Sequence, residues 1–163
     1  MIYTTQTTKA MKIACKAHEG QVDRGGMPYI YHPIHLAELM YDEDSACVAL
    51  LHDVVEDSGI TFEDLEKEGF DKAIIDALKL LTHNKSVPYE EYISNIGDNE
   101  IATRVKLADL CHNSNLSRLK KVTPKDRDRV GKYNIAIEYL IGRINNSPSP
   151  QRKKRGKNLK KDS

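Results

Sequence analysis

One imidazole and three carboxylates occur together near the middle of the chain, at His52, Asp53, Glu56 and Asp57. In a helix, residues four apart lie on one face, so His52 would stand over Glu56 and Asp53 over Asp57. The flanking residues are apolar: Ala49, Leu50, Leu51, Val54 and Val55. Apolar neighbours imply burial, and a buried carboxylate without a counter-charge is costly. We therefore expect a divalent metal at this group.

Two other segments supply side chains of the same chemistry. Upstream, the segment PYIYHP of residues 28–33 places a histidine where a loop meets a helix. Downstream, the segment VKLAD of residues 105–109 places a lone aspartate on an otherwise apolar helical face. Two nitrogens and two oxygens suit manganese, iron or zinc, with positions left for water or substrate. The predicted metal ligands are His32, His52, Asp53 and Asp109, from three separate helices.

The order of these motifs resembles the HD-domain superfamily of metal-dependent phosphohydrolases, in which a histidine is followed by a His-Asp pair and then an aspartate. The chain is more closely similar to the hydrolase domain of the RelA/SpoT alarmone enzymes and their small stand-alone relatives. The resemblance extends from about residue 5 to residue 145. The matching segments are residues 17–21, 26–33, 49–57 and 105–109, together with Asn113.

The resemblance implies a manganese-dependent hydrolase that removes the 3′-pyrophosphate from guanosine tetra- or pentaphosphate (ppGpp), the alarmone of the stringent response. It assigns His32, His52, Asp53 and Asp109 as the metal ligands. Glu56 and Asp57 match the acidic pair that positions or activates the attacking water. Asn113 matches a nucleotide-contacting asparagine.

A phosphorylated substrate also needs positive groups, for which Arg24, Lys106 and Arg118 are candidates. Arg118 could instead form a surface ion pair, and the same alternative holds for Lys132 with Tyr133. The alarmone enzymes usually carry two consecutive basic residues after the His-x-x-Gln segment, whereas here Asp23 precedes Arg24. The sequence therefore supports metal-dependent hydrolysis more firmly than it supports the alarmone as the substrate.

Other functions stay open at this point. The substrate could be another phosphorylated nucleotide, such as a cyclic nucleotide or an NADPH-like dinucleotide phosphate. The same pocket could serve a non-catalytic nucleotide sensor, although a pure binder needs no water-activating pair such as Glu56 and Asp57. His18 either supports the loop from the core or takes part in catalysis. His35 is expected beside the ligands or at the surface, and His83, Cys111 and His112 are interpreted as ordinary polar positions.

Helical periodicity dominates the chain, and strand alternation is absent. Helices are expected over about residues 5–19, 33–40, 44–57, 61–67, 71–81, 89–96, 100–119 and 124–144. Thr61 with Asp64 resembles a capping box, and Pro33 fits a first helical position. The helix that carries the His-Asp pair is apolar nearly all round and should be the central one. We predict a single all-α domain, an HD-type helical bundle, over residues 1–146.

Composition divides the chain into two parts. Residues 147–163 contain seven basic residues and one acidic residue, so the first 146 residues carry a net charge of −5. The Ser-Pro and Lys/Arg-rich composition of residues 147–163 predicts a disordered basic tail. We interpret it as a solubilising segment; weak contact with nucleic-acid phosphates is the alternative.

The remaining composition bears on the compartment. Three scattered cysteines without a Cys-x-x-Cys motif favour a reducing compartment. No apolar run is long enough to span a bilayer, and the first residues lack a signal-peptide pattern. We therefore expect a cytoplasmic protein that has no membrane partner; the resemblance implies that it acts on a nucleotide.

Overall fold

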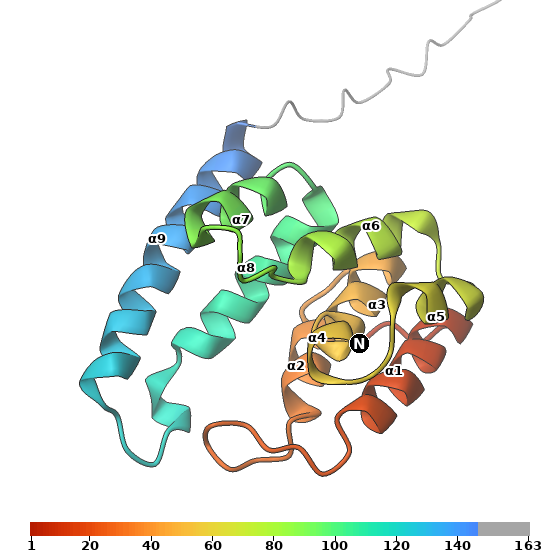
Figure 1. The fold of residues 1–163 in the computed structure, drawn as a ribbon, viewed down its shortest axis with the longest axis horizontal. Helices are drawn as coiled ribbons and strands as arrows, with labels where there is room; N and C mark the ends of the chain where they lie inside the picture. Colours follow the sequence, from red (N-terminus) through yellow and green to blue (C-terminus); the bar gives the residue numbers. More distant parts are fainter. Residues whose placement is uncertain (147–163) are drawn as a thin grey trace, which may run out of the picture.

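The computed structural model describes residues 1–146 as an assembly of helices (Figure 1). Within this range no strand forms, and an isolated antiparallel bridge joins Val22 to Pro28. The helices are α1 (Thr5–Ala17), α2 (Tyr31–Glu38), α3 (Glu43–Leu51), α4 (Val54–Asp57), α5 (Phe62–Lys67), α6 (Lys72–Leu81), α7 (Tyr89–Ile96), α8 (Glu100–Ser114), the 3₁₀ turn η1 (Leu116–Arg118) and α9 (Pro124–Asn146). The all-α prediction is confirmed; the predicted basic tail lies outside the described residues.

Helix α3 is the centre of the fold, as its apolar sequence predicts. Every residue from Ser45 to Leu51 is buried, and α1, α2, α6 and α8 all pack against this helix. A fully buried Leu or Val side chain contributes roughly 1.5–3 kcal/mol by leaving water. The carboxyl end of α3, where His52 lies, is therefore fixed by the best-packed part of the molecule.

Asp42 determines where α3 begins. Its Oδ1 accepts a hydrogen bond from the Ser45 N–H at 2.8 Å, and its Oδ2 accepts one from Arg104 of α8 at 2.6 Å. The Arg104 guanidinium also lies over the ring of Tyr41, 4.0 Å from the centroid. Because Asp42 supplies the cap, the helix starts at Glu43, slightly earlier than a cap at Asp44 or Ser45 would allow. The same carboxylate joins α3 to α8.

The predicted continuous helix through the His-Asp pair is wrong. Helix α3 ends at Leu51 and α4 begins at Val54, with His52 and Asp53 at the junction. The Asp53 backbone turns to φ −102° and ψ −4°. Consecutive helical residues point about 100° apart, yet here the Asp53 Oδ2 lies 2.8 Å from the His52 Nε2 and accepts from the Tyr29 hydroxyl. The turn therefore brings the His52 and Asp53 side chains into contact.

Two other helix ends differ from the sequence prediction. Helix α2 begins at Tyr31 instead of Pro33, because a proline in the first turn lacks only an N–H that has no helical partner. His32 is therefore on a helix and not at the end of a loop.

Helix α8 ends at Ser114, where the Asn115 side chain accepts a hydrogen bond from the Ser117 N–H and starts the 3₁₀ turn. The predicted capping box of Thr61 and Asp64 is confirmed at the start of α5.

Helices α8 and α9 pack against each other along one side of the bundle, with α7 against the end of both (Figure 1). Helix α8 also packs against α2, α3 and α6, so its inner face meets the carboxyl end of α3. Among residues 1–146, no helix is both long and apolar enough to cross a membrane.

Replacing Asp42 with alanine removes the cap of α3 and a partner of Arg104. We expect the free energy of unfolding to fall by about 1 kcal/mol at pH 7, the usual contribution of an N-cap. Burial opposes a low pKa at Asp42, but hydrogen bonds from Ser45 and the Arg104 charge hold the pKa below its ordinary value. Such a carboxylate stabilises the fold above its unfolded pKa of about 4, and the contribution is lost as pH falls through the folded pKa.

Urea unfolding should therefore show a larger difference between wild type and Asp42→Ala at pH 7 than at pH 3. Asp42→Asn is the control, because asparagine keeps a capping oxygen and should lose less stability. An equal loss at both pH values would show that the charge of Asp42 contributes nothing.

Candidate metal centre

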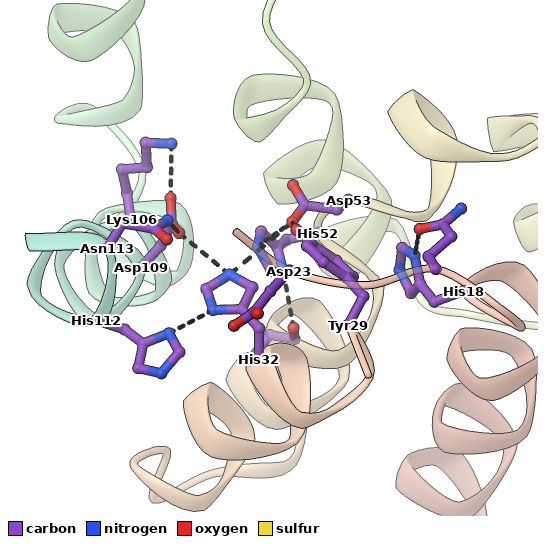
Figure 2. Close-up of polar contacts among 12 residues, drawn as sticks. His18, Asp23, Tyr29, His32, His52, Asp53, Lys106, Asp109, His112 and Asn113 are labelled. Carbon is purple, nitrogen blue, oxygen red and sulfur yellow. Dashed lines mark hydrogen bonds and ion pairs between the residues drawn. The ribbon is translucent and has the colours of Figure 1, made fainter. Parts of the chain in front are cut away.

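Three buried side chains from three helices converge between α3 and α8 (Figure 2). His32 of α2, His52 at the end of α3 and Asp109 of α8 each place one ligand atom within 4.8 Å of the other two. Asp53 lies against this group, with its Oδ2 2.8 Å from the His52 Nε2 and 4.0 Å from the His32 Nε2. The four side chains that the sequence predicted as ligands are thus brought together.

The inner nitrogens of both histidines have the character of metal ligands. The His52 Nδ1 lies 2.9 Å from the Ala49 carbonyl oxygen and donates to it, so the Nε2 is the atom that faces the cluster. Within residues 1–146, neither the His52 Nε2 nor the His32 Nε2 makes a hydrogen bond of good geometry. Buried polar atoms without such a bond call for an explanation, and an ion is one of the usual ones. Two nitrogens and two carboxylates therefore fit a divalent cation.

Two side chains of α8, Lys106 and Asn113, orient Asp109. Lys106 lies 2.8 Å from its Oδ2, and the Asn113 amide donates to its Oδ1 at 2.5 Å. Burial favours the neutral acid, but the positive charges of Lys106 and His52 hold the pKa of Asp109 far below its ordinary value. Burial likewise opposes the charge on Lys106, whose pKa is nevertheless raised by Asp109. Asp109 is therefore ionised and held in one orientation.

His52 and Asp53 form an ion pair of the same kind. Burial disfavours the charge on His52, but Asp53 and Asp109 raise its pKa to about 9. Burial disfavours the charge on Asp53, but His52 lowers its pKa to about 2. A divalent cation would take the place of the imidazole proton that balances these carboxylates, because ligand histidines bind metal in the neutral form.

His112 fixes the orientation of His32, and the sequence interpretation missed it. The two Nδ1 atoms lie 2.7 Å apart, and an Arg118 Nη1 lies 3.1 Å from the same Nδ1 of His112. An arginine can only donate, so a proton on that His112 atom is disfavoured and the His32 Nδ1 is the donor. Burial together with His32 and Arg118 lowers the pKa of His112 to about 4, which keeps it neutral. The signal in the sequence was its position three residues after Asp109 on one helix.

Two cavities adjoin the cluster. The first has a volume of about 230 Å³, and its lining includes Arg24, Tyr29, His32, Asn113, Arg118 and Tyr133. The second has a volume of about 210 Å³, and its lining includes His52, Asp53, Glu56, Tyr89, Lys106 and Asp109. Tyr133 lines both cavities. Residues of the cluster therefore line both cavities.

The predicted water-activating pair lies on α4, and its two members differ. The Glu56 Oε1 accepts the backbone N–H of His83, which fixes Glu56 against the α6–α7 loop in the second cavity. Both side chains are exposed, but Asp57 does not line either of the two cavities; its partial desolvation and the negative charge of Asp53 raise the pKa of Asp57. His83 thus has a role that its sequence position did not indicate.

The negative charge of Asp23 at the first cavity is balanced by Arg118. Its Oδ2 lies 2.6 Å from an Arg118 nitrogen, and its Oδ1 accepts from the N–H groups of Gly25 and Met27 at 2.8 and 2.9 Å. Burial opposes ionisation, but the Met27 N–H and Arg118 keep the pKa of Asp23 below its ordinary value. A Cβ on Gly25 would lie 2.5 Å from the Arg118 carbonyl oxygen, so the loop and the 3₁₀ turn approach closely only with glycine.

The structure also places three further side chains that the sequence singled out: Arg24, Arg118 and His18. Arg24 lines the first cavity and lies 2.6 Å from Asp126, which also pairs with Arg129 at 2.9 Å. Arg118 both lines the cavity and forms an ion pair, so the two alternatives for it hold together. His18 accepts or donates at 2.9 Å with Gln21 and packs on the Tyr29 ring, which favours the supporting interpretation.

Comparison with known proteins places these features in a family. The model of the HD domain matches residues 10–106. The bifunctional (p)ppGpp synthase/hydrolase SpoT of Escherichia coli (strain K12) is 32% identical over 145 residues, which cover 79% of this chain and 20% of that protein. A guanosine-3′,5′-bis(diphosphate) 3′-pyrophosphohydrolase of Borreliella burgdorferi is 37% identical over 142 residues, which cover 76% of this chain and 20% of that protein. The chain spans about a fifth of the length of these relatives.

The fold of one solved structure matches the fold of this protein along nearly the whole chain. It is described as "A metazoan ortholog of SpoT hydrolyzes ppGpp and plays a role in starvation responses", and it matches with a TM-score of 0.70 and 25% sequence identity. The match covers 91% of this chain and 90% of the other. The family match covers more than half of the chain and includes His32, His52 and Asp53. The chain therefore belongs to the HD-domain family.

Proposed function

We propose that this HD domain is a metal-dependent phosphohydrolase that removes the 3′-pyrophosphate from guanosine tetra- or pentaphosphate. The observation that carries the proposal is the convergence of two imidazoles and two carboxylates beside two cavities. The similar proteins named above as (p)ppGpp hydrolases, and the metazoan protein described as hydrolysing ppGpp, support this choice of substrate.

His32, His52, Asp53 and Asp109 would hold the cation. A mixed nitrogen and oxygen set suits manganese, iron or zinc, and the resemblance to the alarmone hydrolases favours manganese. The cation supplies Lewis acidity, which activates water and draws electron density from the phosphoryl oxygens. The chain itself keeps the ligand atoms in place through Lys106, Asn113 and His112.

Glu56 is the group that would take the proton of the attacking water. Its Oε1 is held by the His83 N–H, so its second oxygen is left to act as the base in the second cavity. The water oxygen bonds to the phosphorus atom attached to O3′, and the bond between that phosphorus and O3′ breaks. The products are a nucleotide with a 3′-hydroxyl group and pyrophosphate; the proton taken by Glu56 balances the one that O3′ gains.

The first cavity would hold the nucleotide. The side chains at its rim and behind it contribute three guanidinium groups, from Arg24, Arg118 and Arg129, and two carboxylates, Asp23 and Asp126. One positive charge is left over, which favours a phosphorylated ligand. Asp23 is neutralised by Arg118, so it does not exclude a guanosine polyphosphate by charge.

The direct test is a panel of nucleotides incubated with the manganese-loaded protein, with products identified by mass. We expect ppGpp to yield GDP and pyrophosphate, and cyclic nucleotides and NADPH to be turned over more slowly. Turnover of another nucleotide while ppGpp stays intact would contradict the proposed substrate.

Asp53→Ala should remove both the bound manganese and the turnover, because the cluster loses one of its two carboxylates. Equilibrium dialysis followed by elemental analysis measures the metal, and circular dichroism checks the fold. Asp76→Ala is the control, since Asp76 is an exposed carboxylate of α6 that pairs with Lys72. A variant Asp53→Ala that keeps wild-type manganese would remove Asp53 from the ligand set.

Glu56→Gln should keep the metal and lower kcat by roughly a hundredfold or more, the range for a general base. Glu63→Gln, at an exposed position of α5, should have no effect. Hydrolysis at wild-type speed by Glu56→Gln would show that another group takes the proton, and loss of manganese would show that Glu56 is a ligand.

His112→Leu should weaken manganese binding by about 10- to 100-fold, the usual effect of losing an outer-shell partner of a ligand histidine. Free manganese can be followed by electron paramagnetic resonance during titration. His35→Leu is the matched control, because the His35 ring packs on His112, 4.6 Å between centroids, without being the hydrogen-bond partner of His32. Equal affinities for all three proteins would contradict the orienting role of His112.

A further inference from the structure

Positive charge is concentrated at one corner of the molecule, between α8 and α9 (Figure 1). Residues 118–132 carry seven basic and two acidic side chains, a net charge of +5. The other 131 residues of the range 1–146 carry 11 basic and 21 acidic side chains, a net charge of −10. This range of the chain is therefore strongly polarised, with an isolated positive corner on an otherwise acidic domain.

Three exposed lysines of this corner, here called the corner lysines, form no ion pair with any residue in the range 1–146: Lys120, Lys121 and Lys125. Two arginines of the same corner differ, since Arg118 pairs with Asp23 and Arg129 pairs with Asp126. The field of a paired charge is largely cancelled by its partner, whereas the field of an unpaired surface charge extends into the solvent. The corner lysines therefore contribute a positive field that no neighbouring carboxylate of the described residues cancels.

The corner lysines adjoin the first cavity without lining it. Leu119, the residue before Lys120, lines this cavity, and the Lys120 Nζ lies 3.8 Å from the place that a Cβ on Gly26 would take. Lys125 is four residues before Arg129, which also lines the cavity, so both residues lie on one face of α9. The positive field is therefore strongest beside the entrance to the first cavity.

A phosphorylated nucleotide carries several negative charges, so the acidic part of the surface repels it. Charges act over roughly 30 Å at 0.01 M salt and over roughly 8 Å at physiological salt. A positive field confined to one corner therefore attracts a small polyanion toward the first cavity and away from the rest of the surface. A nucleic acid duplex is a poorer match, because it would extend beyond the corner and meet the acidic surface.

We propose that the corner lysines steer the phosphorylated substrate into the first cavity without contacting it once it is bound. The inference rests on the proposed function, which supplies the polyanionic substrate, and extends it to a surface outside the cavities. Electrostatic steering raises the rate of association and leaves the chemical step unchanged. Neutralising the corner lysines should therefore lower kcat/KM and leave kcat as it is.

The kinetic test combines Lys120→Gln, Lys121→Gln and Lys125→Gln in one variant, assayed with manganese and ppGpp over a range of salt concentrations. We expect kcat/KM to fall roughly tenfold at 0.01 M salt and less than about twofold at 0.5 M salt, because salt screens the field. The value of kcat should not change. Circular dichroism checks that the variant is folded.

The matched control removes the same charge elsewhere, by Lys12→Gln, Lys16→Gln and Lys67→Gln in one variant. These lysines are exposed on α1 and α5, on the other side of the bundle from α9 (Figure 1). We expect kcat/KM of this control to stay within about twofold of wild type at every salt concentration. All proteins are the full chain, so that the basic residues 147–163 contribute equally to each of them.

The field itself can be measured without substrate. A cationic and an anionic nitroxide of equal size broaden the amide proton signals to different extents, and the ratio gives the potential near each amide. With one equivalent of diamagnetic zinc, we expect a positive potential at residues 119–126 and a negative potential over α5. The variant that lacks the corner lysines should lose the positive potential.

The outcomes separate steering from the proposed reaction. A positive potential that the substitutions abolish supports steering even if another phosphorylated nucleotide proves to be the substrate, and the salt series is then run with that nucleotide. A negative potential at the corner overturns steering even if ppGpp is hydrolysed. An equal loss of kcat/KM in both variants, or a loss that persists at 0.5 M salt, also overturns it. Tight binding of duplex DNA that only the corner variant loses would assign the corner to nucleic acid instead.

Discussion

The molecule depends on bringing two carboxylates, Asp53 and Asp109, into a poorly solvated interior and keeping both of them ionised. Burial alone would favour the protonated acids. Instead, Lys106 and His52 hold their pKa values low, and the two histidine Nε2 atoms are directed at the same space. Such a concentration of charge is costly in a fold unless it serves a ligand, and a divalent cation is the ligand that matches this donor set.

The surrounding helices and side chains hold the histidines and carboxylates of this cluster in position. Helix α3 is buried on all sides and carries His52 at its end, so the position of that imidazole is set by core packing. The turn at residues 52–53 brings Asp53 to the same point, and Tyr29 holds it there. A hydrogen-bonded series then runs from Asp23 through Arg118 and His112 to His32. The loop at the first cavity is thereby connected to the metal centre, and the same residues shape both.

Much of this was predictable from the sequence, and the limits have physical causes. The ligand motifs and most helices follow from residue types and helical periodicity, which are local properties. The position of the Asp53 carboxylate beside His52 was not predictable, because Asp53 accepts a hydrogen bond from Tyr29, a residue distant in sequence. The ion pair of Asp23 was not predictable for the same reason: its partner Arg118 is 95 positions away. His112 was assigned to an ordinary polar position although its spacing from Asp109 was available, since only the structure shows that His32 faces it.

The most direct measurement is pulsed electron paramagnetic resonance on the manganese-loaded protein. Two directly bound imidazole nitrogens should give two ¹⁴N couplings to the manganese, one of which disappears in His32→Ala and the other in His52→Ala. A spectrum without nitrogen coupling, or one that neither substitution changes, would show that the cation is held elsewhere and that the assigned centre is not the site of chemistry.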